Sequence, residues 1–433
     1  MWGIEGKLGY VADDKNPENW LRTGFPARYL YEKLLPEVVA EFSPGTTYHK
    51  GSPYGNPDRP DGWYQKVGDN HQWNVWHGTQ EKYQNFDKLS GRFVSEFGME
   101  AFPSHKTVKS YLPEDDPSEH HSFSSTVEFH NKADGAERRV ATYLAENITF
   151  RHDPLESYIY STQLMQSEAL SAAYRLWRRN WKGPGREYNA GALVWQINDC
   201  WPVTSWAIID YDFIPKLSYY GIKRALEPIT IGSKRTEVRT PRDPYTDAHV
   251  DIQHRLSVWV SSFMVSVDES KTYTLSLKAF DIKTGELLTE RKVAEMLIPV
   301  NRTVEVPDFV LPGWKPAPPG TDAHHRIAVG LYLHSDEDGR LVARDVSWPE
   351  PLKFIDFSKN PGVKVSKGEN GLVVEAEKPV KGVEVVGEDG TAWKDNGIDL
   401  LPGDKVVVGG DLKVSEVGLR WLTGEKTVQA KVL

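Results

Sequence analysis

The spacing of apolar residues changes near residue 228, and this change is the feature that most constrains the fold. Residues 155–181 have apolar side chains three or four apart, which predicts a long amphipathic helix. Residues 191–197 are almost continuously apolar, as expected for a strand buried on both faces. Helices alternating with such strands favour an α/β unit with parallel strands before residue 228.

After residue 228 the apolar residues alternate instead. This pattern runs through residues 255–263 and 273–280, and a turn at residues 283–285 follows, which predicts antiparallel hairpins. A second change follows residue 357, where short Val-rich segments lie between glycines. We therefore expect an α/β plus all-β chain whose last two parts are immunoglobulin-like β-sandwiches. The expected domains are residues 1–228, 229–356 and 357–433.

Charge and cysteine content exclude several classes of protein. Lys+Arg number 52 against Asp+Glu 61, and the resulting net charge of -9 argues against a nucleic-acid partner. Cys200 is the only cysteine, so no intrachain disulfide can form, which fits a reducing compartment such as the cytoplasm. No signal peptide or membrane-spanning run is recognisable in the sequence.

Metal and thiol chemistry are not expected. The spacing of His120, His121, His130 and His152 fits no standard zinc pattern, so we predict no metal and no cofactor. Cys200 lies at the end of an apolar run and is interpreted as a small core residue rather than a nucleophile.

Tryptophan is unusually abundant, and its distribution is uneven. The chain has 15 tryptophans, and most of them precede residue 210. An indole ring can fill a core, and it can equally form a platform for the apolar face of a sugar. The composition therefore hints at carbohydrate without establishing it.

Glu96 interrupts an apolar, aromatic segment that reads as a short strand. A carboxylate among such neighbours is costly to bury unless it is paired or hydrogen-bonded. The simple interpretation is a salt bridge to a basic group such as Arg92. The alternative is catalysis, because a carboxylate at a strand end walled by aromatic rings suits attack on a sugar carbon.

Three predicted strands end in mixtures of polar and aromatic residues. The first mixture covers residues 69–78, in which residues 73–76 are the strand candidate, the second contains Glu96, and the third covers residues 195–202. In (β/α)8 barrels the carboxyl ends of the strands carry the active site. Aromatic faces with amide, imidazole and carboxylate groups match the apolar face and hydroxyl rim of a pyranose, although Trp195 and Trp201 could equally be core residues.

These motifs resemble the β-mannosidases of glycoside hydrolase family 2, and the fungal, apparently intracellular branch is the most similar. The resemblance rests on residues 70–78, 95–99 and 191–211, and it continues through residues 348–352 and 399–404. It implies the C-terminal half of a (β/α)8 TIM barrel, with strands 5–8 in residues 1–228, followed by the two β-sandwiches. It also implies a retaining exo-hydrolase that removes terminal β-D-mannose from a β-mannoside glycan.

The resemblance assigns roles to individual residues. It implies that Glu96, on the seventh barrel strand, is the catalytic nucleophile. It implies a pocket for the terminal mannose formed by residues of the sixth and eighth strands. These are His71, Trp73, Trp76 and His77, and then Trp195, Asn198, Asp199 and Trp201.

The sequence departs from the family at the acid/base residue. The family carries this glutamate after an asparagine on the fourth strand, and no Asn-Glu dipeptide occurs here. Glu5 is the carboxylate nearest to the expected place. We therefore expect a chain that is incomplete for catalysis, and a catalytically inactive or vestigial carbohydrate-binding protein is the alternative. An open half-barrel would expose strand edges, which favours self-association, but the sequence leaves the oligomeric state open.

Overall fold

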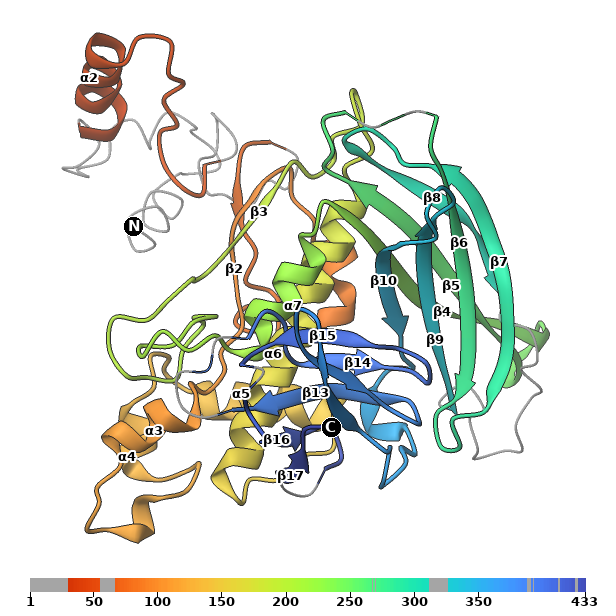
Figure 1. The fold of residues 1–433 in the computed structure, drawn as a ribbon. Coiled ribbons are helices and arrows are strands. Elements are labelled where there is room, and N and C mark those ends of the chain that lie inside the picture. The colour runs from red at the N-terminus through yellow and green to blue at the C-terminus, as the bar shows by residue number, and fades with distance from the viewer. Residues whose placement is uncertain are drawn as a thin grey trace. The chain divides into compact units, whose positions relative to one another are not determined.

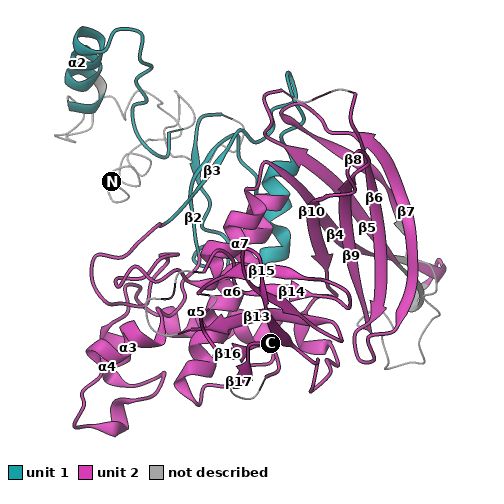
Figure 2. Ribbon diagram, viewed as in Figure 1, with its two compact units in different colours: residues 1–98, 176–195 teal, residues 99–175, 196–433 magenta. Residues whose placement is uncertain are grey.

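The computed structural model describes residues 30–54, 67–266, 268, 270–310, 326–387, 391, 393–411, 413–424 and 427–433. Glu5 lies outside these residues. The chain forms two compact units, one of residues 1–98 and 176–195 and one of residues 99–175 and 196–433 (Figure 2). Each unit is built around its own elements.

A three-stranded parallel sheet lies at the centre of the first unit, in the order β1-β2-β3. Its strands are β1 (Asn70–His71), β2 (Val94–Phe97) and β3 (Ala192–Val194). Val94 N donates to Gly191 O at 2.9 Å and Gln72 N donates to Glu96 O at 2.8 Å, so β2 is bonded on both sides. The predicted parallel strands are thus confirmed. The unit also contains a π-helical turn at Leu30–Leu34, α2 (Leu35–Phe42) and a 3-10 helix at Tyr83–Leu89.

The segment Trp73 to Trp76, predicted as a strand because of its aromatic and β-branched residues, is instead a turn directly after β1. The N–H groups of His77 and Gly78 both donate to Trp73 O, at 3.0 and 2.7 Å, and this closes the turn. Trp76 has a φ of 83°, in the left-handed region, which a strand cannot accommodate. The strand prediction there was wrong by a few residues.

The expectation that the run at residues 191–197 is buried on both faces is also wrong. Leu193 is 54% exposed and Trp195 is 42% exposed. Among the described residues β3 is an edge strand of its sheet. Leu193 and Trp195 are alternate residues and lie on the same face of the chain, which is not covered. Directly before β3 the chain is tightly packed, because a Cβ at Gly191 would lie 2.7 Å from the ring of Phe93.

Three aromatic rings anchor β2 in the first unit. The ring of Phe97 lies 4.8 Å from Trp177 and 6.2 Å from Phe86, both in edge-to-face geometry. The Trp177 indole donates to Phe86 O at 2.8 Å, which satisfies its buried N–H. Trp177 belongs to the last turns of α6 (Leu155–Arg179), the helix that the sequence predicted at residues 155–181.

The helices of the second unit precede its β-sheets in the chain, apart from one short turn (Figure 1). Ser104 and Ser124 accept hydrogen bonds from backbone N–H groups of the first turns of α3 and α4, as N-capping residues do. Besides residues 155–175 of α6, the helices are α3 (His105–Tyr111), α4 (Ser125–Phe129), α5 (Ala136–Asn147) and α7 (Leu217–Ala225), with 3-10 turns at Pro117–Glu119 and Leu352–Phe354.

Two antiparallel sheets follow, ordered β4-β5-β8 and β10-β9-β6-β7. Buried residues of both sheets, among them Val258 of β5 and Leu331 of β9, form one apolar core. Gly285, with a φ of 81°, turns β6 into β7, and the predicted alternating segments are confirmed as strands. The strands are β4 (Ile229–Asp243), β5 (Thr246–Ser262), β6 (Thr272–Asp281), β7 (Leu287–Leu297), β8 (Arg302–Val310), β9 (Ile327–Ser335) and β10 (Leu341–Ser347).

The C-terminal residues form two smaller sheets, ordered β11-β12-β15 and β14-β13-β16-β17. They enclose a second apolar core in which Val374 of β12 and Val385 of β13 are buried. The described chain is thus mostly β-sheet with some helices. The strands are β11 (Lys364–Gly368), β12 (Gly371–Glu375), β13 (Val380–Val386), β14 (Ile398–Leu400), β15 (Val406–Gly409), β16 (Glu416–Arg420) and β17 (Val428–Lys431).

Candidate functional site

Glu96 lies next to the end of β2, opposite His71 of β1 in the parallel register. Side chains alternate along a strand, so the face opposite to buried Phe97 carries Glu96. The Glu96 side chain is 17% exposed, which keeps it within reach of a ligand. Arg92 and Glu96 are both described and form no ion pair, so the simple interpretation of Glu96 as the partner of Arg92 is wrong.

Two nitrogen atoms approach the same oxygen of Glu96. His71 Nδ1 lies 3.3 Å from Glu96 Oε2, and the Trp73 indole N–H donates to Oε2 at 3.4 Å. His71 itself is buried, and burial lowers its pKa below the ordinary histidine value, although the carboxylates of Glu96 and Asp69 oppose this. The His71 imidazole is therefore neutral at neutral pH, and Glu96 lies beside a neutral donor or acceptor rather than a fixed cation.

Asp69, one residue before β1, is the centre of a hydrogen-bond network that the sequence did not identify. Burial by itself would raise its pKa, but the hydrogen bonds that it accepts bring the pKa below the ordinary value. Ser52 Oγ also lies 3.1 Å from His71 Nε2, which connects Asp69 to the histidine beside Glu96. The donors to Asp69 are Ser52 Oγ at 2.6 Å, Ser95 Oγ at 2.5 Å, His49 Nε2 at 2.7 Å and Tyr54 N at 2.8 Å.

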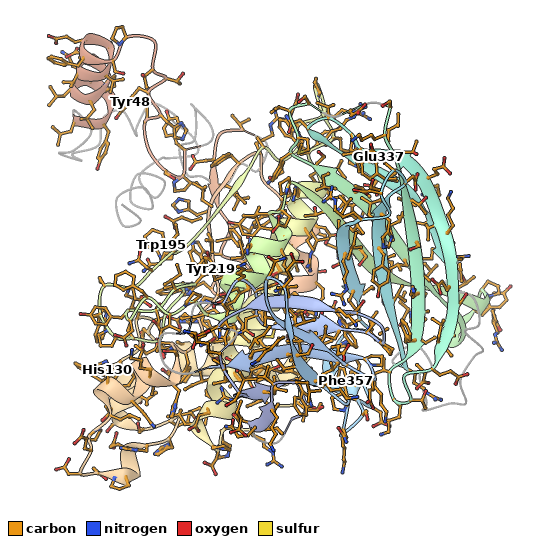
Figure 3. All side chains as sticks on the ribbon, viewed as in Figure 1. Tyr48, His130, Trp195, Tyr219, Glu337 and Phe357 are labelled. Carbon is orange, nitrogen blue, oxygen red and sulfur yellow. The ribbon has the colours of Figure 1, made fainter. Side chains whose placement is uncertain are left out.

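The remaining predicted pocket residues of the first unit are aromatic. The His77 ring lies 5.5 Å from Trp73 and 6.4 Å from Trp76, both edge-to-face, and Trp76 is fully buried. Trp195 directly follows β3, and its N–H donates to Phe97 O at 2.8 Å, so the end of β2 holds it (Figure 3). The structure therefore brings the predicted residues of the first unit to the ends of adjacent strands.

Asn198, Asp199 and Trp201 belong to the second unit. Asp199 is buried there and is engaged by two partners, Lys132 Nζ at 3.0 Å and Ser205 Oγ at 2.7 Å. An ion pair of this kind gives Asp199 a structural role whether or not it also contacts a ligand. Lys132 was missed by the sequence reasoning, because nothing in its local segment signals a partner 67 residues later.

Trp201 is part of an aromatic group that the sequence also missed. The ring of His130 stacks on Tyr111 at 4.0 Å with an interplanar angle of 6°, and it lies 5.2 Å from Trp201. His130 (Figure 3) is held in place because its Nδ1 lies 2.7 Å from Pro202 O. A flat imidazole fixed in this way provides an edge for hydrogen bonding next to the indole.

The prediction that Cys200 is a core residue is wrong, because the cysteine is free and exposed. The reason is that β3 already ends at Val194, so Cys200 lies in the following loop. Within the described residues, no cluster of three or more histidine, cysteine or acidic side chains could hold a metal ion. The same part of the chain contains no helix whose length and apolar character would allow it to cross a bilayer.

A second glutamate, Glu100, is enclosed in the other unit. It is 2% exposed, and neither carboxylate oxygen has a hydrogen-bond partner among the described residues. Burial raises its pKa to about 8, against the attraction of Lys216 and Arg139. Lys216 is buried as well, and its ammonium donates to Ala101 O at 2.8 Å and to Ser205 O at 3.3 Å. Burial lowers the pKa of Lys216 to about 8.

Comparisons with known proteins agree with this arrangement. Residues 254–353 match the family described as Mannosidase Ig/CBM-like domain. The chain is 48% identical over 96% of its length to Beta-mannosidase B of Thermothelomyces thermophilus, and it covers 48% of that protein. It is 43% identical over 93% of its length to Beta-mannosidase B of Aspergillus terreus, of which it covers 46%.

Solved structures lead to the same family. The β-D-mannosidase of Dictyoglomus thermophilum is similar to this chain, with a TM-score of 0.76 and 26% identity. The match covers 98% of this chain and 48% of the mannosidase chain. The chain is related to the β-mannosidases of glycoside hydrolase family 2. An exo-chitosanase of Amycolatopsis orientalis shares the fold, with a TM-score of 0.55 and 16% identity over 84% of this chain and 45% of its own.

The chain spans about half the length of the β-mannosidases that it matches. The resemblance stated from the motifs around Glu96 is thus confirmed across nearly the whole sequence. The similar proteins are named as enzymes, which does not favour a non-catalytic carbohydrate-binding protein.

Proposed function

We propose that this chain is the C-terminal half of a retaining exo-β-mannosidase and that Glu96 is its nucleophile. The observation that carries the proposal is the position of Glu96 at the end of the central strand of a parallel sheet, beside His71 and Trp73, in a relative of β-mannosidases. The proposed domains are a partial (β/α)8 barrel with strands 5–8, and two immunoglobulin-like β-sandwiches. Their boundaries are residues 1–228, 229–356 and 357–433.

In the proposed reaction, a carboxylate oxygen of Glu96 attacks the anomeric carbon of a terminal β-D-mannose unit. The bond to the leaving oxygen breaks as a covalent mannosyl–enzyme ester forms, and a carboxylic acid protonates that oxygen. Water then attacks the anomeric carbon, the bond from that carbon to Glu96 breaks and frees the carboxylate, and the deprotonated acid now acts as a base and takes a proton from the water. We assign the role of orienting the carboxylate to Trp73 and His71, whose nitrogen atoms lie 3.4 and 3.3 Å from Glu96 Oε2.

We assign the terminal-mannose pocket to aromatic and polar side chains that follow β1 and β3. The partly exposed indole of Trp195 supports a stacking role there. The proposed sugar-binding residues are His71, Trp73, Trp76, His77, Trp195, Asn198, Asp199 and Trp201. The proposed ligand is a β-mannoside oligosaccharide or glycan.

The proposal includes a missing acid/base group. No Asn-Glu dipeptide occurs in the sequence, and the chain spans about half of each relative, so the proton donor is assigned to a part that this chain lacks. Catalytic geometry tolerates displacements of only about 1 Å, so we assign this role to no other carboxylate of the described residues. We also propose a cytoplasmic location, and self-association through the open edge of the sheet.

The test separates attack from proton donation. A 2-deoxy-2-fluoro-β-mannosyl fluoride has a leaving group that needs little protonation, so Glu96 can be labelled without the acid. We expect mass spectrometry of the digested chain to locate the fluoromannosyl group on Glu96. The variant Glu96→Gln should remain unlabelled, and the matched variant Glu100→Gln should be labelled like the unmodified chain.

Two results would contradict the proposal. A label on any other residue would remove Glu96 from the nucleophile role. Turnover of an aryl β-mannoside at the rate of a full-length relative would show that the chain carries its own acid/base group. Slow labelling without turnover is the expected combination.

A further inference from the structure

A cavity of about 220 Å³ lies in the second unit, between the start of α6 with the segment before it and the loop after β16. It is smaller than the sites of drug-sized ligands, which occupy about 300–1,000 Å³, so its size suits a single ring. None of the residues around it was assigned to the proposed mannose pocket. Its ligand must therefore be inferred from its own lining.

Aromatic rings form one wall of this cavity, which Phe150, Tyr160 and Trp421 line. Tyr160 is fixed, because its hydroxyl donates to Gly382 O at 2.7 Å. Trp421 is partly exposed, and Gly424 lies directly against it: a Cβ at Gly424 would be 3.3 Å from an indole carbon. The glycine thus leaves the indole surface uncovered, as stacking by the apolar face of a sugar ring requires.

Hydroxyl and guanidinium groups form the remainder of the lining. Arg420 donates through Nε to Thr427 Oγ1 at 2.7 Å and through Nη1 to Glu384 Oε2 at 3.2 Å. A guanidinium has five N–H donors, and Nη2 of Arg420 makes no hydrogen bond to the described residues. Partly exposed Glu384 pairs with Arg420 at 3.2 Å and offsets part of the positive charge of a lining that also contains the Arg151 guanidinium.

The two sides of the cavity are held together by a buried ion-pair network. Lys381 of β13 lies 2.8 Å from Glu168 of α6 and 2.9 Å from Asp399 of β14. Because the ammonium is 3% exposed and contacts two carboxylates, its removal would leave buried charges uncompensated. The cavity is therefore formed before a ligand arrives, which reduces the entropy cost of binding.

We propose that this cavity is a second, non-catalytic binding site for one neutral hexopyranose unit of a glycan. The indole of Trp421 carries the ring, and the hydroxyl groups of the lining together with Arg420 Nη2 bond its hydroxyls. This binding is independent of Glu96 and goes beyond the proposed hydrolase activity. It would keep a branched or extended glycan on the protein between cleavage events.

The test uses the full chain and methyl α-D-mannopyranoside, which is not a β-mannoside and is not hydrolysed by the proposed activity. Binding is measured by saturation-transfer NMR and calorimetry. We expect Trp421→Ala to weaken binding by about tenfold or more, because the aromatic surface is lost. The variant Gly424→Val, which fills the space over the indole and leaves the ring in place, should have the same effect.

Matched controls separate this site from the proposed active site and from misfolding. Trp393→Ala removes an indole that, like Trp421, packs against the C-terminal apolar core but does not line the cavity, and binding should be unchanged. Glu96→Gln should also bind as the unmodified chain does. Loss of binding in Glu96→Gln but not in Trp421→Ala would overturn the proposal, as would no binding at all. Competition by inorganic phosphate would overturn it in favour of an anion site.

Discussion

Glu96 and Glu100 are four residues apart in the sequence, yet the chain treats their identical side chains in opposite ways. Glu96 retains some exposure, and two nitrogen atoms lie within 3.4 Å of its Oε2. Glu100 is almost completely enclosed, lacks hydrogen-bond partners among the described residues and has a pKa raised by burial to about 8. Environment rather than residue type thus decides which carboxylate can act as a nucleophile.

The difference follows from local structure. Glu96 and Phe97 are adjacent in β2, so their side chains point to opposite faces of the sheet. Because Phe97 packs into an aromatic core, Glu96 lies on the opposite face. Glu100 comes after the strand has ended, where side chains no longer alternate and buried Lys216 is the main cation acting on it. An acid kept protonated at neutral pH cannot attack a sugar carbon, and this supports Glu96 over Glu100.

The largest expected effect comes from removing the anchor beneath Glu96. Phe97→Ala deletes a ring that is fully buried against Phe86 and Trp177, and a change of this kind costs about 3–5 kcal/mol in the free energy of unfolding. In the same variant, labelling of Glu96 by the fluoromannosyl reagent should also decrease. Urea unfolding measures the first quantity and mass spectrometry the second. The exposed Phe42→Ala should change unfolding by less than about 0.5 kcal/mol, and equal losses in both variants would refute the anchoring role.

Glu100 should make stability fall as pH rises. Its folded pKa of about 8 lies above the ordinary value of 4.5, so the folded chain binds more protons between these pH values and loses stability through the window. The loss reaches about 5 kcal/mol at most, at about 1.4 kcal/mol per pKa unit. Urea unfolding from pH 5 to pH 8 should show this slope, and the slope should be reduced in Glu100→Gln. Parallel profiles for the two proteins would contradict the buried, protonated state.

Lys216 should have the opposite effect at higher pH. Its folded pKa of about 8 lies below the ordinary 10.5, so the unfolded chain binds more protons between these values and stability rises with pH there. The rise is at most about 3 kcal/mol, and Lys216→Met should remove it. With Glu100, this predicts a minimum of stability near pH 8 in the unmodified chain. If the stability of Lys216→Met still has a minimum near pH 8 and still rises above it, the buried, neutral state of Lys216 is contradicted.

Much of the fold could be predicted because it depends on local periodicity. The helical spacing of α6 and the alternation in β5 and β6 are properties of short segments, and all three elements were predicted. The segment after β1 was not predicted correctly, because Trp73 and Trp76 favour strands intrinsically while a left-handed residue at Trp76 closes a turn. Propensity was overridden there by backbone geometry.

The site was predictable only in part, for a related reason. Glu96 could be singled out as a candidate because a lone carboxylate in an apolar strand is visible within a few residues. The partners of Asp69 could not, since Ser52 and Asp69 are 17 residues apart and meet only in the folded chain. Lys132 and Asp199 are separated by 67 residues. Long-range polar contacts carry no local sequence pattern.

The smallest expected effect concerns the indole N–H beside Glu96. Trp73→Phe keeps an aromatic ring near His77 but removes the donor that lies 3.4 Å from Glu96 Oε2. A bond of this length to a carboxylate contributes about 1 kcal/mol, so labelling of Glu96 should slow by about fivefold while the unfolding free energy changes little. The rate is read from a time course of labelled peptide, with Trp393→Phe as the matched change far along the chain. If Trp73→Phe labels as fast as the unmodified chain, the Trp73 indole does not orient the carboxylate, and the comparison with Glu100 loses that donor.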